Sequence, residues 1–204
     1  MILFADTETT GLPMTGQPAG SGAHPHIVQL GAQLCDSNRR VVAEMNLLIK
    51  PKNWGVPAEA AAVHGITTEM CAEYGFNIGT AMKLFAQLVR RSKLVVCHNL
   101  PFDDLLLQTE FIRCIYGEEL EDYKAVAKYC TQEASAPILN LPPTPRMIAA
   151  GFNKPKSPNL REAYLFFTGK ELEGAHDAMA DVRGCRAVYY GIQDRAKEQE
   201  PLEV

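Results

Sequence analysis

The sequence contains no long uninterrupted hydrophobic run and no closely spaced pair of cysteines. Without such a run no membrane-spanning helix is expected, and the apolar start of the chain is too short and too soon acidic to be a signal peptide. The six cysteines are scattered without a CxxC pair, which disfavours a zinc site or disulfides and predicts buried thiols in a reducing compartment. We therefore expect a cytoplasmic protein with no membrane association.

An excess of positive charge is also missing, because 20 basic residues stand against 24 acidic ones for a net charge of −4. A protein that coats long nucleic acid usually presents a broad basic surface. The composition disfavours that class but permits a protein that grips a short end. The 204 residues suffice for one substantial domain, which we place at residues 1–193, with a tail at 194–204.

The hydrophobic patterns predict an α/β domain without repeats. A Gly/Pro-rich segment at 14–26 is expected to flex without regular structure, residues 125–131 are ambiguous, and a Pro-rich segment at 136–146 separates two parts of the domain. Expected strands cover residues 2–5, 27–35, 40–49 and 93–97, and expected helices cover 78–91, 103–116, 159–167 and 176–197, with short helical pieces on either side of Gly65.

Two carboxylates follow the first predicted strand. Asp6 and Glu8 are two positions apart, so in an extended chain their side chains project to the same side while Thr7 points away. Like charges this close are expected where a cation lies between them or where water surrounds them fully. The apolar run before them favours the cation, although an ordinary acidic turn ending at Gly11 stays open on this stretch alone.

A second acidic site follows the strand at 93–97, where Asp103 and Asp104 begin a predicted helix. Acids at a helix start are often only favourable partners of the helix dipole. Helical spacing places Asp103 on the face of Leu107 and Phe111, toward the sheet, and turns Asp104 toward solvent.

A third site lies on the last predicted helix, where Asp181 is the only charged member of an otherwise apolar face. Burial of a lone carboxylate costs several kcal/mol unless a cation or a donor meets it. Asp177 is better explained as the helix N-cap, and His176 before it could be structural or catalytic. The apolar members of this face are Ala178, Val182, Cys185, Val188, Tyr189 and Ile192.

Together, Asp6, Glu8, Asp103 and Asp181 would form an all-oxygen site, which suits Mg²⁺ or Mn²⁺ rather than zinc. Four carboxylates call for two cations. Paired divalent ions can stabilise both the attacking and the leaving oxygen of a phosphodiester displacement, with a nearby histidine as proton acceptor.

Three short motifs carry a family resemblance: "DTETTG" at 6–11, "HNLPFD" at 98–103 and "HDAMAD" at 176–181. In order and spacing they resemble the three exonuclease motifs of the DnaQ-like 3′-to-5′ exonucleases of the DEDDh type. The segments "HIVQLGAQL" and "VHGIT" are also similar to connecting segments of that family. The resemblance covers roughly residues 1–192.

The resemblance implies a ribonuclease H-like fold, an α/β mixed β-sheet flanked by α-helices with the acids at one end. It implies that Asp6, Glu8, Asp103 and Asp181 hold two metal ions and that His176 is the general base. Residues implied to contact the terminal nucleotide or shape its pocket are Thr9, Thr10, Leu12, His64, His98 and Asn99. Thr9 and Thr10 could equally be turn residues, and Leu12 could belong to the core.

The expected function is a metal-dependent exonuclease that releases nucleoside monophosphates from single-stranded 3′ ends, of DNA rather than RNA. An RNA-trimming enzyme of the ribonuclease T or oligoribonuclease type stays an alternative, as does a proofreading subunit that acts partly as an interaction module. A homodimer and a polymerase partner both stay open. Basic residues that could guide the phosphate backbone, or simply be solvated, are Lys154, Lys156 and Arg161, or Arg90, Arg91 and Lys93.

Overall fold

A five-stranded mixed sheet forms the centre of the computed structural model, which describes residues 1–199. Its strand order is β3-β2-β1-β4-β5, in which β4 and β5 run parallel to β1 while β2 runs antiparallel to both of its neighbours. The predicted mixed sheet and its hairpin beside the first strand are confirmed. The strands are β1 (Ile2–Thr9), β2 (Ile27–Cys35), β3 (Val41–Leu48), β4 (Leu94–Cys97) and β5 (Ala127–Cys130).

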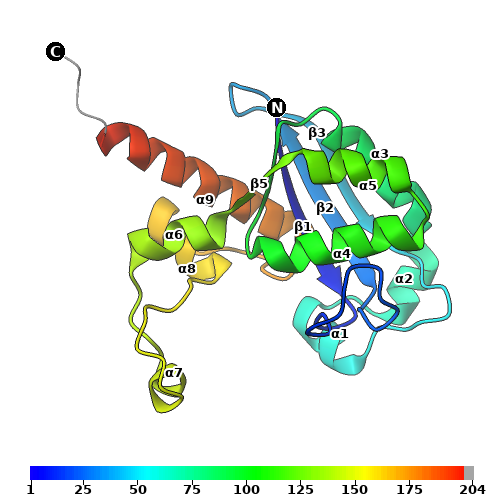
Figure 1. Cartoon of the computed structure of the whole chain (residues 1–204), viewed down its shortest axis with the longest axis horizontal. Helices are drawn as coiled ribbons and strands as arrows, with labels where there is room; N and C mark the ends of the chain where they lie inside the picture. Colours follow the sequence, from blue (N-terminus) through cyan, green and yellow to red (C-terminus); the bar gives the residue numbers. More distant parts are fainter. Residues whose placement is uncertain (200–204) are drawn as a thin grey trace.

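Helices cover both faces of the sheet (Figure 1). On one face Leu3 and Ala5 of β1 pack in a core with α3 (Ile78–Val89), α4 (Leu100–Arg113) and α5 (Gly117–Ala125). On the other face Phe4 packs against α9 (Ala178–Gln199). The helices α6 (Thr131–Leu139) and α8 (Leu160–Thr168) lie against α9. Because neighbouring residues of β1 serve opposite faces, its buried apolar run is explained.

The short helices α1 (Ala58–His64) and α2 (Thr68–Tyr74) form as the sequence predicts. Gly65 ends α1 in the left-handed conformation, at φ 74°, where a residue without a side chain is favoured. The Thr67 side chain caps α2 by accepting a hydrogen bond from the backbone N–H of Met70. Both helices lie near the end of the sheet at which β1 terminates (Figure 1).

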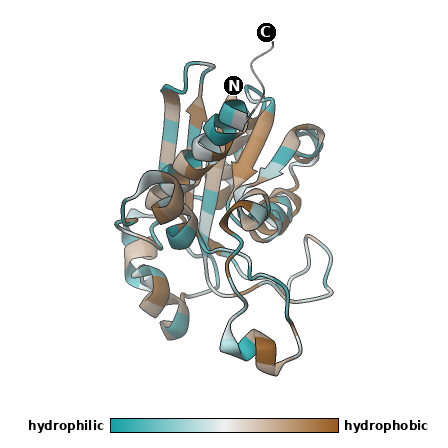
Figure 2. Ribbon diagram, turned by 90° about the vertical axis from the view of Figure 1, so that its left-hand side faces the viewer, coloured by the Kyte–Doolittle hydropathy of each residue, from teal (hydrophilic) through white to brown (hydrophobic). Residues whose placement is uncertain are grey.

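The structure defines three segments more closely than the sequence does. The ambiguous segment at 125–131 contains β5 and the first residue of α6, and α6 continues through Pro137 to Leu139. The Pro-rich segment that follows leads into the five-residue helix α7 (Pro145–Ala149), which projects away from the body of the protein (Figures 1 and 2). Helix α9 crosses the predicted boundary at residue 193 and reaches Gln199. The rest of the predicted tail, at 200–204, lies outside the described residues.

The Gly/Pro-rich segment at 14–26 has no helix or strand, as predicted, and hydrogen bonds hold part of the segment that the sequence leads us to expect to flex. Arg113 of α4 donates hydrogen bonds to the carbonyl oxygens of Ser21, His24 and Pro25 at 2.7 to 3.2 Å. Its guanidinium also pairs with the buried Glu110 at 2.6 Å. The segment is therefore tied to the body through one half-buried cation.

The fold bears on two expectations drawn from the composition, that the cysteines are buried free thiols and that no helix spans a membrane. All six cysteines are free, and five of them are buried. None of the helices within residues 1–199 is both long enough and apolar enough to cross a membrane.

Candidate active site

The first pair of acids lies at the end of β1, on the side of the strand opposite to the Thr7 side chain. Asp6 and Glu8 share the face of Phe4, toward α9, as strand alternation predicts. Thr7 points to the α4 side, where its hydroxyl donates to Asp103 Oδ1 at 2.8 Å. Thr7 therefore ties the first acidic motif to the second.

Asp103 reaches this end because β4 runs parallel to β1, so the chain leaves both strands at the same edge and enters α4. The residue is only 2% exposed, in agreement with the predicted orientation toward the sheet. The prediction that Asp104 turns to solvent is wrong. Asp104 is partly buried and accepts hydrogen bonds from Tyr123 and Gln108, because α5 covers that side of α4.

The third acid, Asp181, lies in the first turn of α9. This helix starts close against β2: a side chain at Gly31 would come within 2.9 Å of the Ala178 backbone, so only glycine permits the approach. Asp177 acts as the predicted cap, accepting from the backbone N–H of Ala180. Gln29 of β2 holds the same turn, donating to Asp177 and accepting from Ala178 N–H.

His176 lies in the loop before α9, with a left-handed backbone at φ 71°. Such a conformation is uncommon for a residue with a side chain. Its backbone N–H donates to Asp181 Oδ2 at 3.3 Å. One side-chain atom from each of Glu8, His176 and Asp181 lies within 4.8 Å of the others, so the exposed imidazole stands directly beside two of the acids.

The carboxylates raise one another's pKa. Burial, followed by the charges of Asp103, Asp181 and Glu8, raises the pKa of Asp6 well above its ordinary value. Burial and the charges of Asp181 and Asp103 raise the pKa of Glu8 to about 8, and burial raises that of Asp103 to about 7 against the opposing hydrogen bond from Thr7. The protein groups around the cluster therefore do not neutralise the negative charge of its carboxylates.

The donor set fits divalent cations. Asp181 Oδ1 is buried and has no hydrogen-bond partner among residues 1–199. A buried carboxylate oxygen with no donor is costly unless a cation meets it. The oxygens of Asp6, Glu8, Asp103 and Asp181 are the ligand type that Mg²⁺ and Mn²⁺ prefer.

A cavity of about 520 Å³ adjoins Glu8. Of the residues implied to contact a terminal nucleotide, Thr9, Thr10, Leu12 and His64 line it. Leu12 is 85% exposed, so it does not belong to the core. The hydroxyls of both threonines also hold the turn, because Thr9 donates to the Gly11 carbonyl and Thr10 accepts from His26 N–H.

His98 and Asn99 do not line this cavity. His98 is buried, and burial lowers its pKa to about 4, so the ring is neutral at physiological pH. Its Nε2–H donates to the carbonyl oxygen of Pro158, while the Thr131 hydroxyl contacts Nδ1. Asn99 is exposed and adopts the left-handed conformation that precedes α4. The prediction that these two residues shape the pocket of the terminal nucleotide stays a prediction.

Sequence reasoning missed several contributors to the site. Thr7 and Gln29 carry no pattern of their own, since their roles arise from contacts across 96 and 148 residues. Phe102 lines the cavity, and its place immediately before Asp103 was the available signal. A glycine inside a predicted strand, Gly31, was the signal for the close approach of α9.

Comparison with known proteins gives a consistent family and fold. The family model described as exonuclease (RNase_T) matches residues 3–189. The DNA polymerase III subunit epsilon-like protein of Rhodobacter capsulatus is 37% identical over 111 residues, covering 53% of this chain and 13% of that protein. The DNA polymerase III subunit epsilon of Pasteurella multocida is 35% identical over 109 residues, covering 53% of this chain and 41% of that protein. The chain thus matches less than half the length of these relatives.

The fold is similar to that of E. coli Exonuclease I. The structure of that enzyme with a dT13 oligonucleotide matches 97% of this chain and 42% of its own, with a TM-score of 0.75 at 22% identity. A zinc-bound form of the Exonuclease I–ssDNA complex matches with a TM-score of 0.74, again at 22% identity and covering 97% of this chain and 41% of that one. The predicted ribonuclease H-like arrangement of a mixed sheet flanked by helices is confirmed.

Proposed function

Since this chain belongs to the exonuclease family, we propose that it is a metal-dependent 3′-to-5′ exonuclease that acts on single-stranded DNA ends and releases nucleoside 5′-monophosphates. The observation that carries the proposal is the convergence of acids from β1, α4 and α9, with one buried oxygen of Asp181 lacking a donor. Such a cluster has no evident structural purpose, because its charges repel one another.

Each residue has a distinct task. Asp6, Glu8, Asp103 and Asp181 would hold two divalent cations, which when bound supply electrostatic stabilisation to the attacking and leaving oxygens. Thr7 fixes the orientation of Asp103. His176, beside Glu8 and Asp181, accepts the proton of the attacking water at an imidazole nitrogen.

The cavity beside Glu8 supports the proposal of action at an end rather than within a strand. Leu12 and Phe102 offer apolar contacts for a terminal base or sugar, and His64 closes the side near Thr9, whose carbonyl oxygen lies 3.3 Å from His64 Nε2. A strand that must place its last nucleotide in this cavity is cut one residue at a time.

We favour DNA because the Exonuclease I structures with similar folds contain DNA oligonucleotides. RNA trimming stays the alternative for substrate class, since discrimination depends on contacts to the 2′-hydroxyl. The names of the relatives, polymerase III subunit epsilon, favour a second candidate role: proofreading in complex with a polymerase.

The test incubates 5′-labelled linear DNA, linear RNA and circular single-stranded DNA with the protein, in Mg²⁺ or in EDTA. We expect stepwise shortening of linear DNA in Mg²⁺, mononucleotide products, and no attack on circles. An Asp181→Asn preparation controls for contaminating nucleases. Full activity in EDTA, or equal degradation of circles, would contradict the proposal.

A further inference from the structure

The segment formed by residues 140–158, the α7 arm, has no task in the site described above. It leaves the body after α6, turns at α7 and returns to α8, and Figure 1 shows it projecting at the end of the molecule where β1 terminates. Within residues 1–199, the hydrogen bonds of its tip, from Pro142 to Pro155, stay inside the arm. The fold does not need this tip for its core.

The base of the arm is joined to the catalytic end. The carbonyl oxygen of Pro158 accepts hydrogen bonds from His98 and Gln132, and His98 directly follows β4 in the same motif as Asp103. The backbone N–H of Lys156 donates to Leu141, which closes the base. Just beyond it, the charge of Arg161 acts on the Asp181 carboxylate. The arm therefore rises from the rim of the acidic site.

The charge of the arm is opposite to that of the chain. Residues 140–158 contain three basic residues and no acidic one, in a chain of net charge −4. Lys156 pairs with Glu162 at 2.5 Å, while Arg146 and Lys154 are exposed. The two exposed cations are available to phosphates.

Apolar side chains accompany these cations. Phe152 is 65% exposed and Ile148 is 53% exposed, and Figure 2 shows hydrophobic residues on the ribbon of α7. An exposed aromatic ring beside cations is the combination with which proteins hold single strands, because bases stack on the ring while the cations meet the backbone.

We propose that the α7 arm binds the single strand upstream of the scissile bond, with Phe152 stacking on a base and Arg146 and Lys154 contacting phosphates. The proposal rests on the proposed function, since it assigns the arm to the same substrate. It makes strand length a determinant of affinity: a short oligonucleotide fills only the cavity beside Glu8, whereas a longer one also reaches the arm.

The test measures binding without hydrolysis, by fluorescence anisotropy of 5′-labelled DNA in EDTA, with strands of three and twenty nucleotides. We expect Phe152→Ala to weaken binding of the longer strand about 10-fold, as loss of one stacked base does. The ratio of the dissociation constants for the two strands then shrinks. A double variant, Arg146→Ala with Lys154→Ala, should flatten the salt dependence by about 1.4 in log–log slope, at roughly 0.7 for each phosphate contact.

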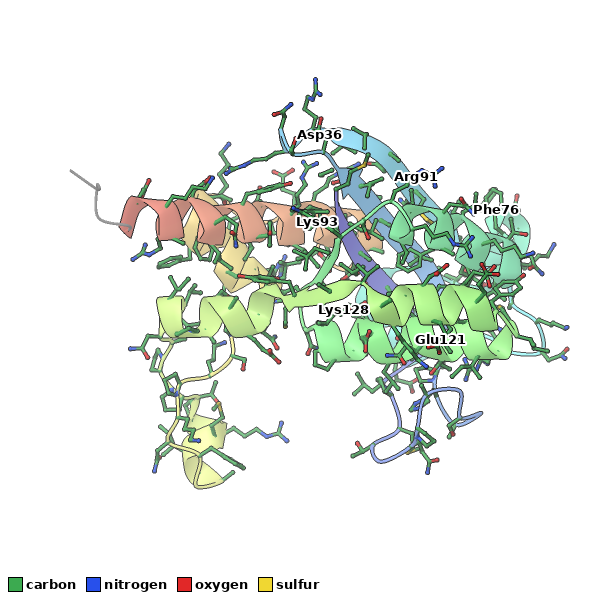
Figure 3. The ribbon with its side chains drawn as sticks, turned by 45° about the horizontal axis from the view of Figure 1, so that its top comes forward. Asp36, Phe76, Arg91, Lys93, Glu121 and Lys128 are labelled. Atoms are coloured by element: carbon green, nitrogen blue, oxygen red, sulfur yellow. The ribbon has the colours of Figure 1, made fainter. Side chains whose placement is uncertain are left out.

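Matched controls lie elsewhere on the surface. Tyr74 is 61% exposed at the end of α2, and Tyr74→Ala removes an aromatic ring of similar exposure. Arg91, one of the residues that the sequence offers as an alternative phosphate contact, precedes β4 at the end of the sheet opposite the acids and lies on the other side of the molecule from α7 (Figure 3). A strand held by the arm does not reach it, so Arg91→Ala removes an equivalent charge outside the proposed path. Both should leave binding of the longer strand unchanged.

Equal affinity of Phe152→Ala and wild type for the longer strand would overturn the proposal, as would equal losses in the two controls. Failure of the proposed function is distinguishable, because a protein that binds the strand through Phe152 but hydrolyses nothing would keep the arm assignment and remove the catalytic one.

Discussion

Two irregular segments flank the same end of the sheet, and they differ in how they are held. Residues 14–26 and the α7 arm are both rich in Pro or Gly. The first is bound to α4 through Arg113 and through Thr109, whose hydroxyl accepts from Gly20 N–H. The second projects with Arg146, Lys154 and Phe152 exposed. Composition predicts the lack of regular structure, whereas contacts with distant residues decide whether such a segment belongs to the body.

The contrast suggests that the two segments have different roles. Residues 14–26 follow Gly11 and Leu12, which line the cavity, and a largely buried ion pair with several carbonyl partners allows them little movement. An arm attached only at its base can adjust to different strands. Both roles require that the end of the sheet between the segments is catalytic, which the first two predictions test.

The largest effect is expected from Asp181→Asn. Loss of one carboxylate charge from a site that would hold two cations should slow hydrolysis by roughly 10³-fold or more while leaving the fold intact. Single-turnover rates in Mg²⁺ with far-UV circular dichroism measure both properties. Near-normal rates would show that the acids between the two segments are not the reaction centre.

His176→Ala comes next, with an expected loss of roughly 10²- to 10⁴-fold, the range for a positioned proton acceptor. The affinity for Mn²⁺, measured by titration, should change little, because the four carboxylates stay in place. A variant that retains wild-type single-turnover hydrolysis at neutral pH would return His176 to a structural role.

The comparison itself is tested by an Arg→Met substitution at the α4 residue that holds the first segment and by the same substitution within the second segment. Arg113→Met removes the cation from the buried Glu110 and from three carbonyl oxygens, so we expect the free energy of unfolding to fall by about 3–5 kcal/mol. Arg146→Met in the exposed arm should change it by less than about 0.5 kcal/mol. Urea denaturation of both variants provides the values, and equal losses would refute the contrast.

The smallest effect concerns pH and cations. Carboxyl groups whose pKa is raised by folding, to about 8 for Glu8 and about 7 for Asp103, bind protons more tightly in the folded chain than in the unfolded one. The metal-free protein should therefore lose stability as pH rises from about 4.5 toward 8. We expect Tm in EDTA to fall by roughly 5 °C between pH 5 and 8. Added Mg²⁺ should raise Tm more at pH 8 than at pH 5. Glu8→Gln should flatten both trends.

Much of this protein could be read from local patterns. The alternation in β1, the caps at Gly65 and Thr67, and the apolar face of α9 are set by neighbouring residues, so spacing alone predicts them. Asp6, Glu8 and Asp181 stood out as candidates because a charge on an apolar face, or two acids after a strand, conflicts with simple burial. The roles proposed for Asp103 and His176 depended on the family resemblance as well.

What only the tertiary structure decided depends on contacts between distant residues. Arg113 holds a segment almost ninety positions earlier, and Asp104 faces Tyr123 rather than water. His98 supports Pro158 instead of the cavity. No local period encodes these pairings, because each side chain satisfies its hydrogen bonds wherever the packed chain brings a partner within about 3 Å.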